Sequence, residues 1–193
     1  MGLTVEEEKK RLRKRFVSAR NGLSSNELFF KSRLISSRFI NTKAYLNAGV
    51  IQCYVSINRQ NEVATRNLIE HMLGQGKKVV VPKIEGQARL SHFYIEGLEE
   101  LTENSWGVAE PTEKDQSPAE IENLDLIIVP MVSGDRFKNR LGYGKGFYDR
   151  FLEGVNATKV GFLFDAQLYE NKLPTDNFDV QLDMLITESK IVT

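Results

Sequence analysis

The chain has 193 residues, of which 41% are hydrophobic and 27% are charged, a composition that is ordinary for one globular domain. Lys and Arg total 26, as do Asp and Glu, so the net charge of zero provides no overall field for holding nucleic acid or an anionic membrane. Cys53 is the single cysteine, which excludes an intrachain disulfide and a cysteine-based zinc cluster. No apolar run reaches the ~18 residues of a membrane span, and the charged N-terminus differs from a signal peptide. We therefore expect a cytoplasmic protein that binds neither membrane nor nucleic acid.

In the first half of the chain, periodicity predicts two helices and then strands around a third helix. The first helix is polar and basic, so we expect it to be exposed, and the second begins at a capping box formed by Ser24 and Glu27. Pro82 is expected to stop the second strand, because proline cannot donate to a sheet ladder. In chain order these elements are helices over residues 4–20 and 24–41, a strand at 48–57, a helix near 62–73, and strands at 78–82 and 88–95.

In the second half, residues 97–123 are rich in Glu, Pro, Thr and Ser and suggest a long surface connection around Trp106. Residues 124–130 form a short continuous apolar run, typical of a strand that is covered on both faces. A glycine-rich loop, a helix near 145–154 and strands at 160–164 and 184–187 follow. Strands that alternate with helices predict one α/β domain over residues 1–193, a layered sheet that is largely parallel and has helices on both faces.

The most informative segment is the glycine loop, residues 140–149, which follows the buried strand and leads into a helix. Ligands of open α/β sheets bind at the carboxyl ends of the strands. Three glycines at alternate positions let backbone N–H groups approach an anion. The helix N-terminus adds partial positive charge, and Arg140 and Lys145 add full charges. The loop is a candidate phosphate site; a structural turn with solvated charges is the alternative.

Neither of the common phosphate-binding motifs fits this loop. A P-loop would need Gly in place of Asn139 and Ser or Thr in place of Gly146, and a dinucleotide fingerprint would need Gly in place of Phe147. Asp149 lies four residues after Lys145. It either pairs with that lysine on one helical face or holds Mg²⁺ together with phosphate oxygens.

Residues 129–149 as a whole resemble the signature of the 5-formyltetrahydrofolate cyclo-ligase family. The matching features are Val129-Pro130, Asp135 and the run from Asn139 to Asp149. The resemblance implies that Arg140 and Lys145 are catalytic and that Asp149 binds Mg²⁺. It further implies that ATP is bound by Arg140, Leu141, Gly142, Tyr143, Gly144, Lys145, Gly146, Phe147 and Tyr148.

The N-terminal segment resembles the family more weakly. Its basic run from Lys9 to Arg13 is similar to a family pair that contacts ATP, which implies that role for Lys9 and Arg13. The i, i+4 spacing places both residues on one helical face, where they could grip one polyphosphate. A solvated basic face is the alternative.

Three further stretches resemble the family. Glu62 and Thr65 match its Glu-x-x-Thr, which implies that Glu62 binds the folate beside Val55; a carboxylate suits the paired donors of a pterin. Without the resemblance, Glu62 is a carboxylate at a helix start. Trp106 precedes a Gly-x-x-Glu-Pro stretch. It either stacks on the folate or serves as a hydrophobic anchor for the loop that contains it. Asp179 is similar to a metal-binding aspartate of the family.

The chain also departs from the family pattern at four positions. Gly134 stands where the family often has Phe, Lys138 where it often has Gly, Phe147 where Tyr is usual, and Phe178 where His is common. These departures affect the loop's shape, but no charged group expected at the phosphates is missing.

The resemblance implies an enzyme that closes 5-formyltetrahydrofolate to 5,10-methenyltetrahydrofolate with ATP as co-substrate and Mg²⁺ as cofactor. Phosphorylation of the formyl oxygen, to an iminium phosphate, would drive the closure and release ADP and phosphate. We expect a monomer. A binding protein without turnover is one alternative. A nucleic-acid-binding module on the basic first helix is another, against which the neutral net charge argues.

Overall fold

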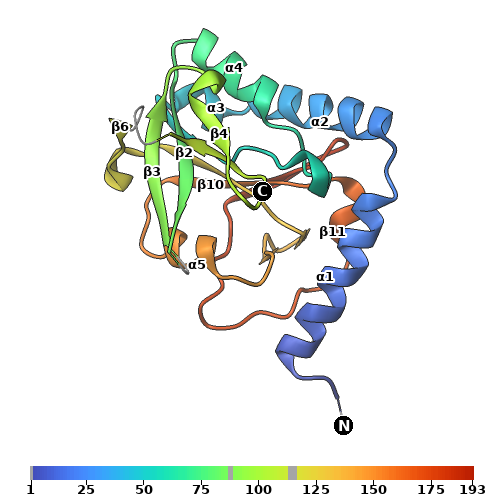
Figure 1. Cartoon of the computed structure of the whole chain (residues 1–193). Coiled ribbons are helices and arrows are strands. Elements are labelled where there is room, and N and C mark those ends of the chain that lie inside the picture. Colours follow the sequence, from blue (N-terminus) through green and yellow to red (C-terminus); the bar gives the residue numbers. More distant parts are fainter. Residues whose placement is uncertain (1, 87–88, 113–116) are drawn as a thin grey trace.

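The computed structural model describes residues 2–86, 89–112 and 117–193 and centres on an eight-stranded sheet (Figure 1). In spatial order its strands are β13 (Ile191–Val192), β12 (Met184–Ile186), β10 (Thr158–Phe162), β7 (Leu126–Val129), β1 (Val50–Cys53), β2 (Lys78–Glu85), β3 (Arg89–Ile95) and β6 (Ser117–Pro118). Neighbouring strands from β12 to β2 are parallel, whereas β13, β3 and β6 pair antiparallel at the two edges. The expectation of a largely parallel sheet is confirmed.

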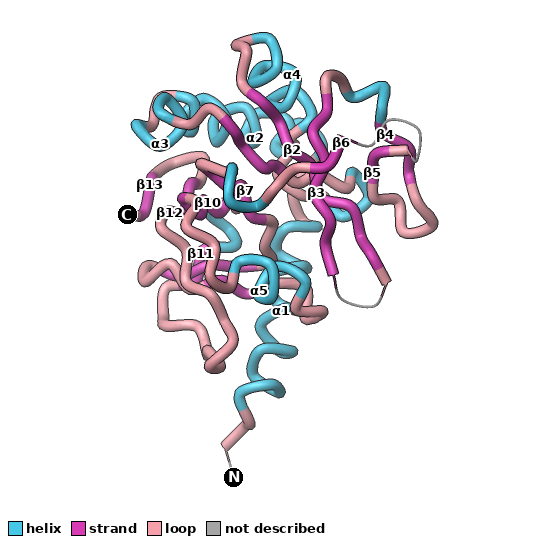
Figure 2. The backbone as a smooth tube through the Cα atoms, turned by 90° about the vertical axis from the view of Figure 1, so that its left-hand side faces the viewer, coloured by secondary structure: helices cyan, strands magenta, loops and turns pink. Residues whose placement is uncertain are grey.

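Helices cover both faces of the sheet, as expected (Figure 2). One face packs against α2 (Ser25–Ile40), α3 (Lys43–Asn47) and α4 (Arg66–Gly74), and its core includes Ile128. The other face packs against α5 (Phe147–Leu152), and its core includes Ile127 and Val129. Successive residues of a strand point to opposite faces, so the continuous apolar run of β7 is buried throughout.

The N-terminal helix α1 (Val5–Asn21) packs outside this sheet, along a smaller one (Figure 1). Leu12 and Phe16 of α1 meet Leu141 and Leu173 in a separate apolar cluster. The strands of the smaller sheet have only two or three residues each, too few for a periodic signal. They are β11 (Leu168–Tyr169), β8 (Ser133–Asp135) and β9 (Arg140–Leu141).

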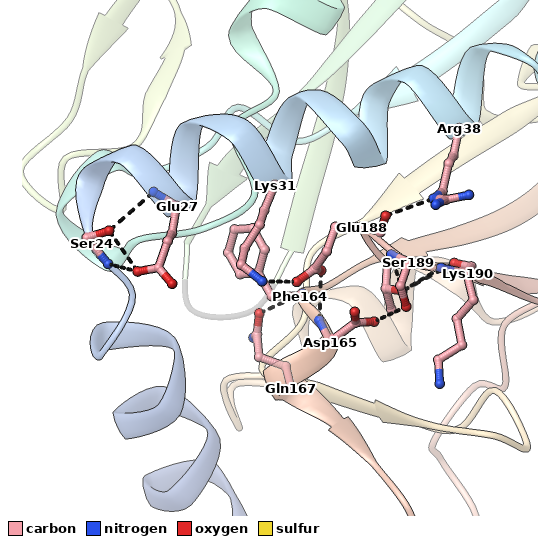
Figure 3. Close-up of polar contacts among 11 residues, drawn as sticks. Ser24, Glu27, Lys31, Arg38, Phe164, Asp165, Gln167, Glu188, Ser189 and Lys190 are labelled. Carbon is pink, nitrogen blue, oxygen red and sulfur yellow. Dashed lines mark hydrogen bonds and ion pairs between the residues drawn. The ribbon is translucent and has the colours of Figure 1, made fainter.

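Capping and one buried carboxylate hold α2 in place (Figure 3). The hydroxyl of Ser24 accepts a hydrogen bond from the Glu27 N–H at 3.3 Å, and the Glu27 carboxylate accepts one from the Ser24 N–H at 2.9 Å, so the predicted capping box is confirmed. Further along α2, Lys31 pairs with Glu188, whose carboxylate also accepts from the Asp165 N–H at 2.8 Å. These contacts tie α2 to the C-terminal segment.

The expected stop at Pro82 is wrong, because β2 continues through it to Glu85. The register between β1 and β2 extends only to Val80, so Pro82 lies beyond the ladder with β1 and is paired with His92 of β3. Proline is tolerated where one side of a strand carries no ladder.

Two other elements differ from expectation. The helix predicted near 62–73 begins only at Arg66, after a 3-10 turn, η1 (Asn58–Gln60). The stretch 97–123 contains a hairpin of β4 (Leu101–Glu103) and β5 (Ala109–Pro111), with Trp106 in its turn and β5 buried. The remaining 3-10 helices are η2 (Leu98–Glu100), η3 (Ile121–Asn123) and η4 (Asp165–Gln167).

Ala88, expected to open the third strand, lies outside the described residues, and β3 starts at Arg89. Cys53 is fully buried, as its apolar run indicates, and burial raises the pKa of its thiol well above the usual range. In the part of the chain that the structure describes, no helix is long and apolar enough to cross a membrane.

Candidate functional site

The strand order creates a switch point between β1 and β7. After β1 the chain crosses one face through α4 to reach β2, and after β7 it crosses the other face through α5 to reach β10. Ligands of open α/β sheets bind at such a point, outside the carboxyl ends of the strands. A cavity of about 170 Å³ lies there.

The walls of this cavity are mostly apolar, and its few charged groups come from the motifs. The charged lining residues are Glu62, Arg140, Lys145 and Asp149, and three tyrosines also line the cavity, Tyr54, Tyr143 and Tyr148. A larger depression, of about 590 Å³, lies beside α5 but contains only Phe147 from the glycine loop. The smaller cavity is the candidate site, because convergent charges in an apolar pocket are typical of ligand sites.

Two glycines of the loop have left-handed backbone conformations, which favour glycine. Gly144 has φ = 91° and Gly146 has φ = 68°. Arg13 of α1 also approaches closely: its Nε donates to the Gly142 carbonyl at 3.0 Å, and a Cβ on Gly144 would lie 3.1 Å from its guanidinium carbon. At Gly144 the loop therefore approaches α1 more closely than a residue with a side chain could without a shift of Arg13.

Arg140 provides a positive charge that is held in place at the cavity by burial and by one carboxylate. It is 7% exposed, and its Nη2 donates to the carboxylate of Asp149. Its Nη1 also lies 3.5 Å from the Pro130 carbonyl. The alternative in which Asp149 pairs locally with Lys145 is wrong, because α5 begins only at Phe147 and Arg140 takes the carboxylate.

Lys145, by contrast, is exposed, and its ammonium group lies 4.6 Å from the centre of the Trp106 ring. Trp106 itself is 46% exposed in the β4–β5 turn. It does not line the cavity, but Val108 and Ala109 of the same hairpin do. The structure thus brings Trp106 to the glycine loop. It leaves open whether Trp106 stacks on the folate or anchors its own loop.

Glu62 lies four residues before α4, so the interpretation as a helix-start carboxylate is wrong. One of its oxygens, Oε2, accepts from the Ile57 N–H at 2.8 Å, and the other accepts from the Tyr143 hydroxyl. Burial raises the pKa of Glu62; these hydrogen bonds and the charge of Arg20 oppose the rise. Val55, also expected at the folate, lines the same cavity and is 5% exposed.

The expectation that α1 is an exposed helix is wrong for one of its faces. Lys9, Leu12, Phe16 and Arg20 are buried, at the three- and four-residue spacing of a helical stripe. The alternative of a solvated basic face therefore fails for Lys9. Its ammonium lies 2.6 Å from Asp176 and also bonds Asp179, and these bonds outweigh the effect of burial and raise the pKa of Lys9.

The two expected metal ligands lie in different surroundings. Asp149 lines the cavity, whereas Asp179 is held by Lys9 and by the N–H of Asp176 at 2.7 Å. Within residues 2–86, 89–112 and 117–193, no group of three or more His, Cys, Asp or Glu side chains is arranged to hold a metal ion.

Two of the family departures have a structural explanation. Lys138 has φ = 65°, a conformation that suits the glycine expected from the resemblance and that Lys adopts at some cost. A Cβ on Gly134 would lie 2.8 Å from the Leu185 side chain, so Phe cannot be placed there without rearrangement. Phe178 is 83% exposed.

Sequence reasoning did not identify one charged residue and several of the residues that line the cavity. Arg20, 2% exposed, donates to the Tyr143 hydroxyl at 2.9 Å. Its spacing from Lys9 and Arg13 places all three near one helical face, which is the signal that could have identified it. The other lining residues that no motif identified are Tyr54, Ile57, Pro82, Ile84 and Leu90.

Comparison with known proteins identifies the family. A model described as the 5-formyltetrahydrofolate cyclo-ligase family matches residues 5–188. The mouse 5-formyltetrahydrofolate cyclo-ligase is 29% identical over 198 residues, 96% of this chain and 96% of the mouse protein. The Escherichia coli K12 5-formyltetrahydrofolate cyclo-ligase is 33% identical over 142 residues, 71% of this chain and 78% of that protein.

A solved structure agrees. The NMR structure of Aquifex aeolicus 5,10-methenyltetrahydrofolate synthetase superposes with a TM-score of 0.83 at 32% identity and covers 95% of this chain and 91% of its own. Sequence and fold therefore agree over nearly the whole length. The chain belongs to the 5-formyltetrahydrofolate cyclo-ligase family, a family of enzymes.

Proposed function

We propose that the chain catalyses the ATP-dependent cyclisation of 5-formyltetrahydrofolate to 5,10-methenyltetrahydrofolate, with release of ADP and phosphate. Family membership supports the cyclo-ligase reaction. The observation that carries the proposal is the hydrogen bond between Tyr143 and Glu62. It joins the loop expected to hold the nucleotide to the carboxylate expected to hold the folate, within one cavity.

The formyl group explains why ATP is needed, because its amide-like oxygen is a poor leaving group. The N5-formyl oxygen attacks the γ-phosphorus of ATP, so that a C–O–P linkage forms and ADP leaves. N10 then attacks the activated carbon and loses its proton. The phosphorylated oxygen departs as inorganic phosphate, and the methenyl bridge is closed.

Phosphoryl transfer of this kind requires positioning and charge stabilisation rather than a protein nucleophile. Arg140 supplies a fixed positive charge, because Asp149 and burial hold it in place. Lys145 is free to turn from the Trp106 ring toward a phosphate, since it is exposed. The N–H groups of residues 141–148 complete the phosphate cradle, and Arg13 orders it through Gly142.

The folate side of the cavity is lined by Glu62 and Val55. The carboxylate of Glu62 accepts the paired N–H donors of the pterin, and Trp106 at the loop stacks on its ring. Lys9 holds the polyphosphate once it turns from Asp179.

Mg²⁺ fits Asp149 better than Asp179. This ion usually takes one or two carboxylates and completes its shell with phosphate oxygens and water. Asp149 lines the cavity and bonds Arg140 through Oδ1, so its Oδ2 can face the ion; Asp179 does not line the cavity, and Lys9 neutralises its charge until Lys9 moves to the polyphosphate. When bound, the ion neutralises phosphate charge.

Formation of methenyl-folate, followed by absorbance with and without ATP, tests this proposal. We expect product only when 5-formyltetrahydrofolate and Mg·ATP are both present. Lys145→Ala should lower kcat by roughly 100-fold or more, the usual cost of removing a group that stabilises transition-state charge. Lys172→Ala, at an exposed lysine outside the cavity lining, is the matched control.

Three outcomes separate the alternatives. Near-normal turnover of Lys145→Ala would remove the glycine loop from the mechanism. Nucleotide binding by the wild type without any product would favour a binding protein that keeps the fold. Equal losses in Lys145→Ala and Lys172→Ala would show that the loop lysine has no special role.

A further inference from the structure

Arg20 is a buried cation with no part in the roles described above. It lies in the last turn of α1 and is 2% exposed. Among the described residues, Arg20 forms no direct ion pair, and its Nε has no hydrogen-bond partner. A buried charge without compensation is costly, so the contact that Arg20 does make needs an explanation.

That contact leads to Glu62. The Nη1 of Arg20 donates to the Tyr143 hydroxyl at 2.9 Å, and the guanidinium lies 5.7 Å from the centre of the Tyr143 ring. The same hydroxyl donates its proton to Oε1 of Glu62. Cation and carboxylate are thus linked through one phenol, and each of the three groups comes from a different segment.

The link leaves Glu62 able to bind a ligand. An ionised carboxylate offers about four lone-pair sites on its two oxygens. Tyr143 uses one site on Oε1, and the Ile57 N–H uses one on Oε2. Both oxygens can still accept from a pair of N–H donors, and the two internal bonds fix the plane in which they do so.

We infer that Arg20 is a positioning residue for the folate: through Tyr143 it holds the Glu62 carboxylate in its binding orientation and couples it to the glycine loop. A donor that is itself polarised by a cation forms the stronger hydrogen bond. Because Tyr143 belongs to the glycine loop, Glu62 keeps its binding orientation while the loop is ordered. When the loop is displaced, Glu62 loses its hydrogen bond to Tyr143 and with it that orientation. The inference rests on the proposed function only in naming 5-formyltetrahydrofolate as the ligand of Glu62.

The experiment is calorimetric titration of 5-formyltetrahydrofolate into the full chain without nucleotide, together with KM and kcat for both substrates. Arg20→Gln and Tyr143→Phe should each weaken folate binding about tenfold or more, the loss expected for a hydrogen bond to a charged group. The KM for ATP should not change in Arg20→Gln. Lys14→Gln, at an exposed lysine of the same helix, is the matched control.

Measurements in a Glu62→Gln background distinguish the positioning role of Arg20 from a merely structural one. If Arg20 acts through Glu62, Arg20→Gln should cause little further loss of folate affinity there, so the two substitutions are not additive. If Arg20→Gln unfolds, Tyr143→Phe still tests the inference, because it removes only a hydroxyl from a surface loop. Wild-type folate affinity in Tyr143→Phe, or additive losses in the double variant, would overturn the inference.

Failure of the proposed function would look different again. A wild-type protein that binds 5-formyltetrahydrofolate through Arg20, Tyr143 and Glu62 but forms no product with Mg·ATP would contradict the reaction and support the positioning role. A wild-type protein that turns over while both variants bind folate normally would support the reaction and contradict the positioning role.

Discussion

The pair between Arg140 and Asp149 should stabilise the fold as well as the cavity. The side chain of Arg140 is 4% exposed and that of Asp149 is 23% exposed. Asp149→Asn keeps the shape of the side chain but leaves the guanidinium buried beside a neutral amide. Removing one partner of a fully buried ion pair costs about 3–5 kcal/mol. Because water reaches Asp149, we expect a lower cost, about 2–3 kcal/mol.

Urea and thermal unfolding measure this loss. For a domain of this size, a loss of about 2–3 kcal/mol lowers Tm by roughly 4–12 °C. Glu153→Gln, an exposed carboxylate one helical turn after Asp149, is the matched control and should leave Tm unchanged.

A double-variant cycle shows whether the cost belongs to the pair. Arg140→Met should destabilise the Asp149→Asn protein less than it destabilises the wild type, because the partner is already lost. A Tm of Asp149→Asn equal to that of the Glu153→Gln control, or additive effects in the cycle, would refute the reasoning that this buried charge depends on Asp149.

Three further outcomes are expected. Burial lowers the pKa of His92 from 6.5 to about 4, so the unfolded chain binds a proton that the native state does not; stability falls as the pH drops through this window. His92→Leu should remove part of that fall in acid-unfolding curves, and parallel curves would contradict the assignment. Glu188→Gln, at a carboxylate that accepts two hydrogen bonds, should cost about 1–3 kcal/mol in urea unfolding; an unchanged midpoint would show that the contacts of Glu188 with α2 do not stabilise the fold. ATP should change the fluorescence of Trp106 in the wild type by drawing Lys145 from its ring; the same change in Lys145→Ala would disprove that contact as its cause.

Features with a short-range physical cause could be predicted from the sequence. Ser24 and Glu27 are three residues apart, and their capping box forms as expected. The continuous apolar run of β7 predicted a strand buried on both faces, and helices do cover both faces. The glycine loop lies at the carboxyl edge of that strand, lining a cavity with Glu62.

Features that depend on distant partners could not be predicted. Hydrophobic periodicity treats Lys9 and Arg20 as solvated, but Lys9 is buried because Asp176, 167 positions away, neutralises it. Likewise, Glu62 finds its partner Tyr143 81 positions along the chain rather than at the nearby helix. Pro82 is tolerated in β2 only because the register with β1 ends before it, which no local pattern reveals.

The central claim is that the glycine loop, residues 140–149, holds the triphosphate beside a folate that is bound at Glu62. A crystal structure with a non-hydrolysable ATP analogue and 5-formyltetrahydrofolate tests it most directly, through the distance from the formyl oxygen to the γ-phosphorus. We predict phosphates on the loop N–H groups and a distance of about 3–3.5 Å, the separation of a near-attack arrangement. A nucleotide bound elsewhere, or a formyl group directed away from it, would contradict the claim.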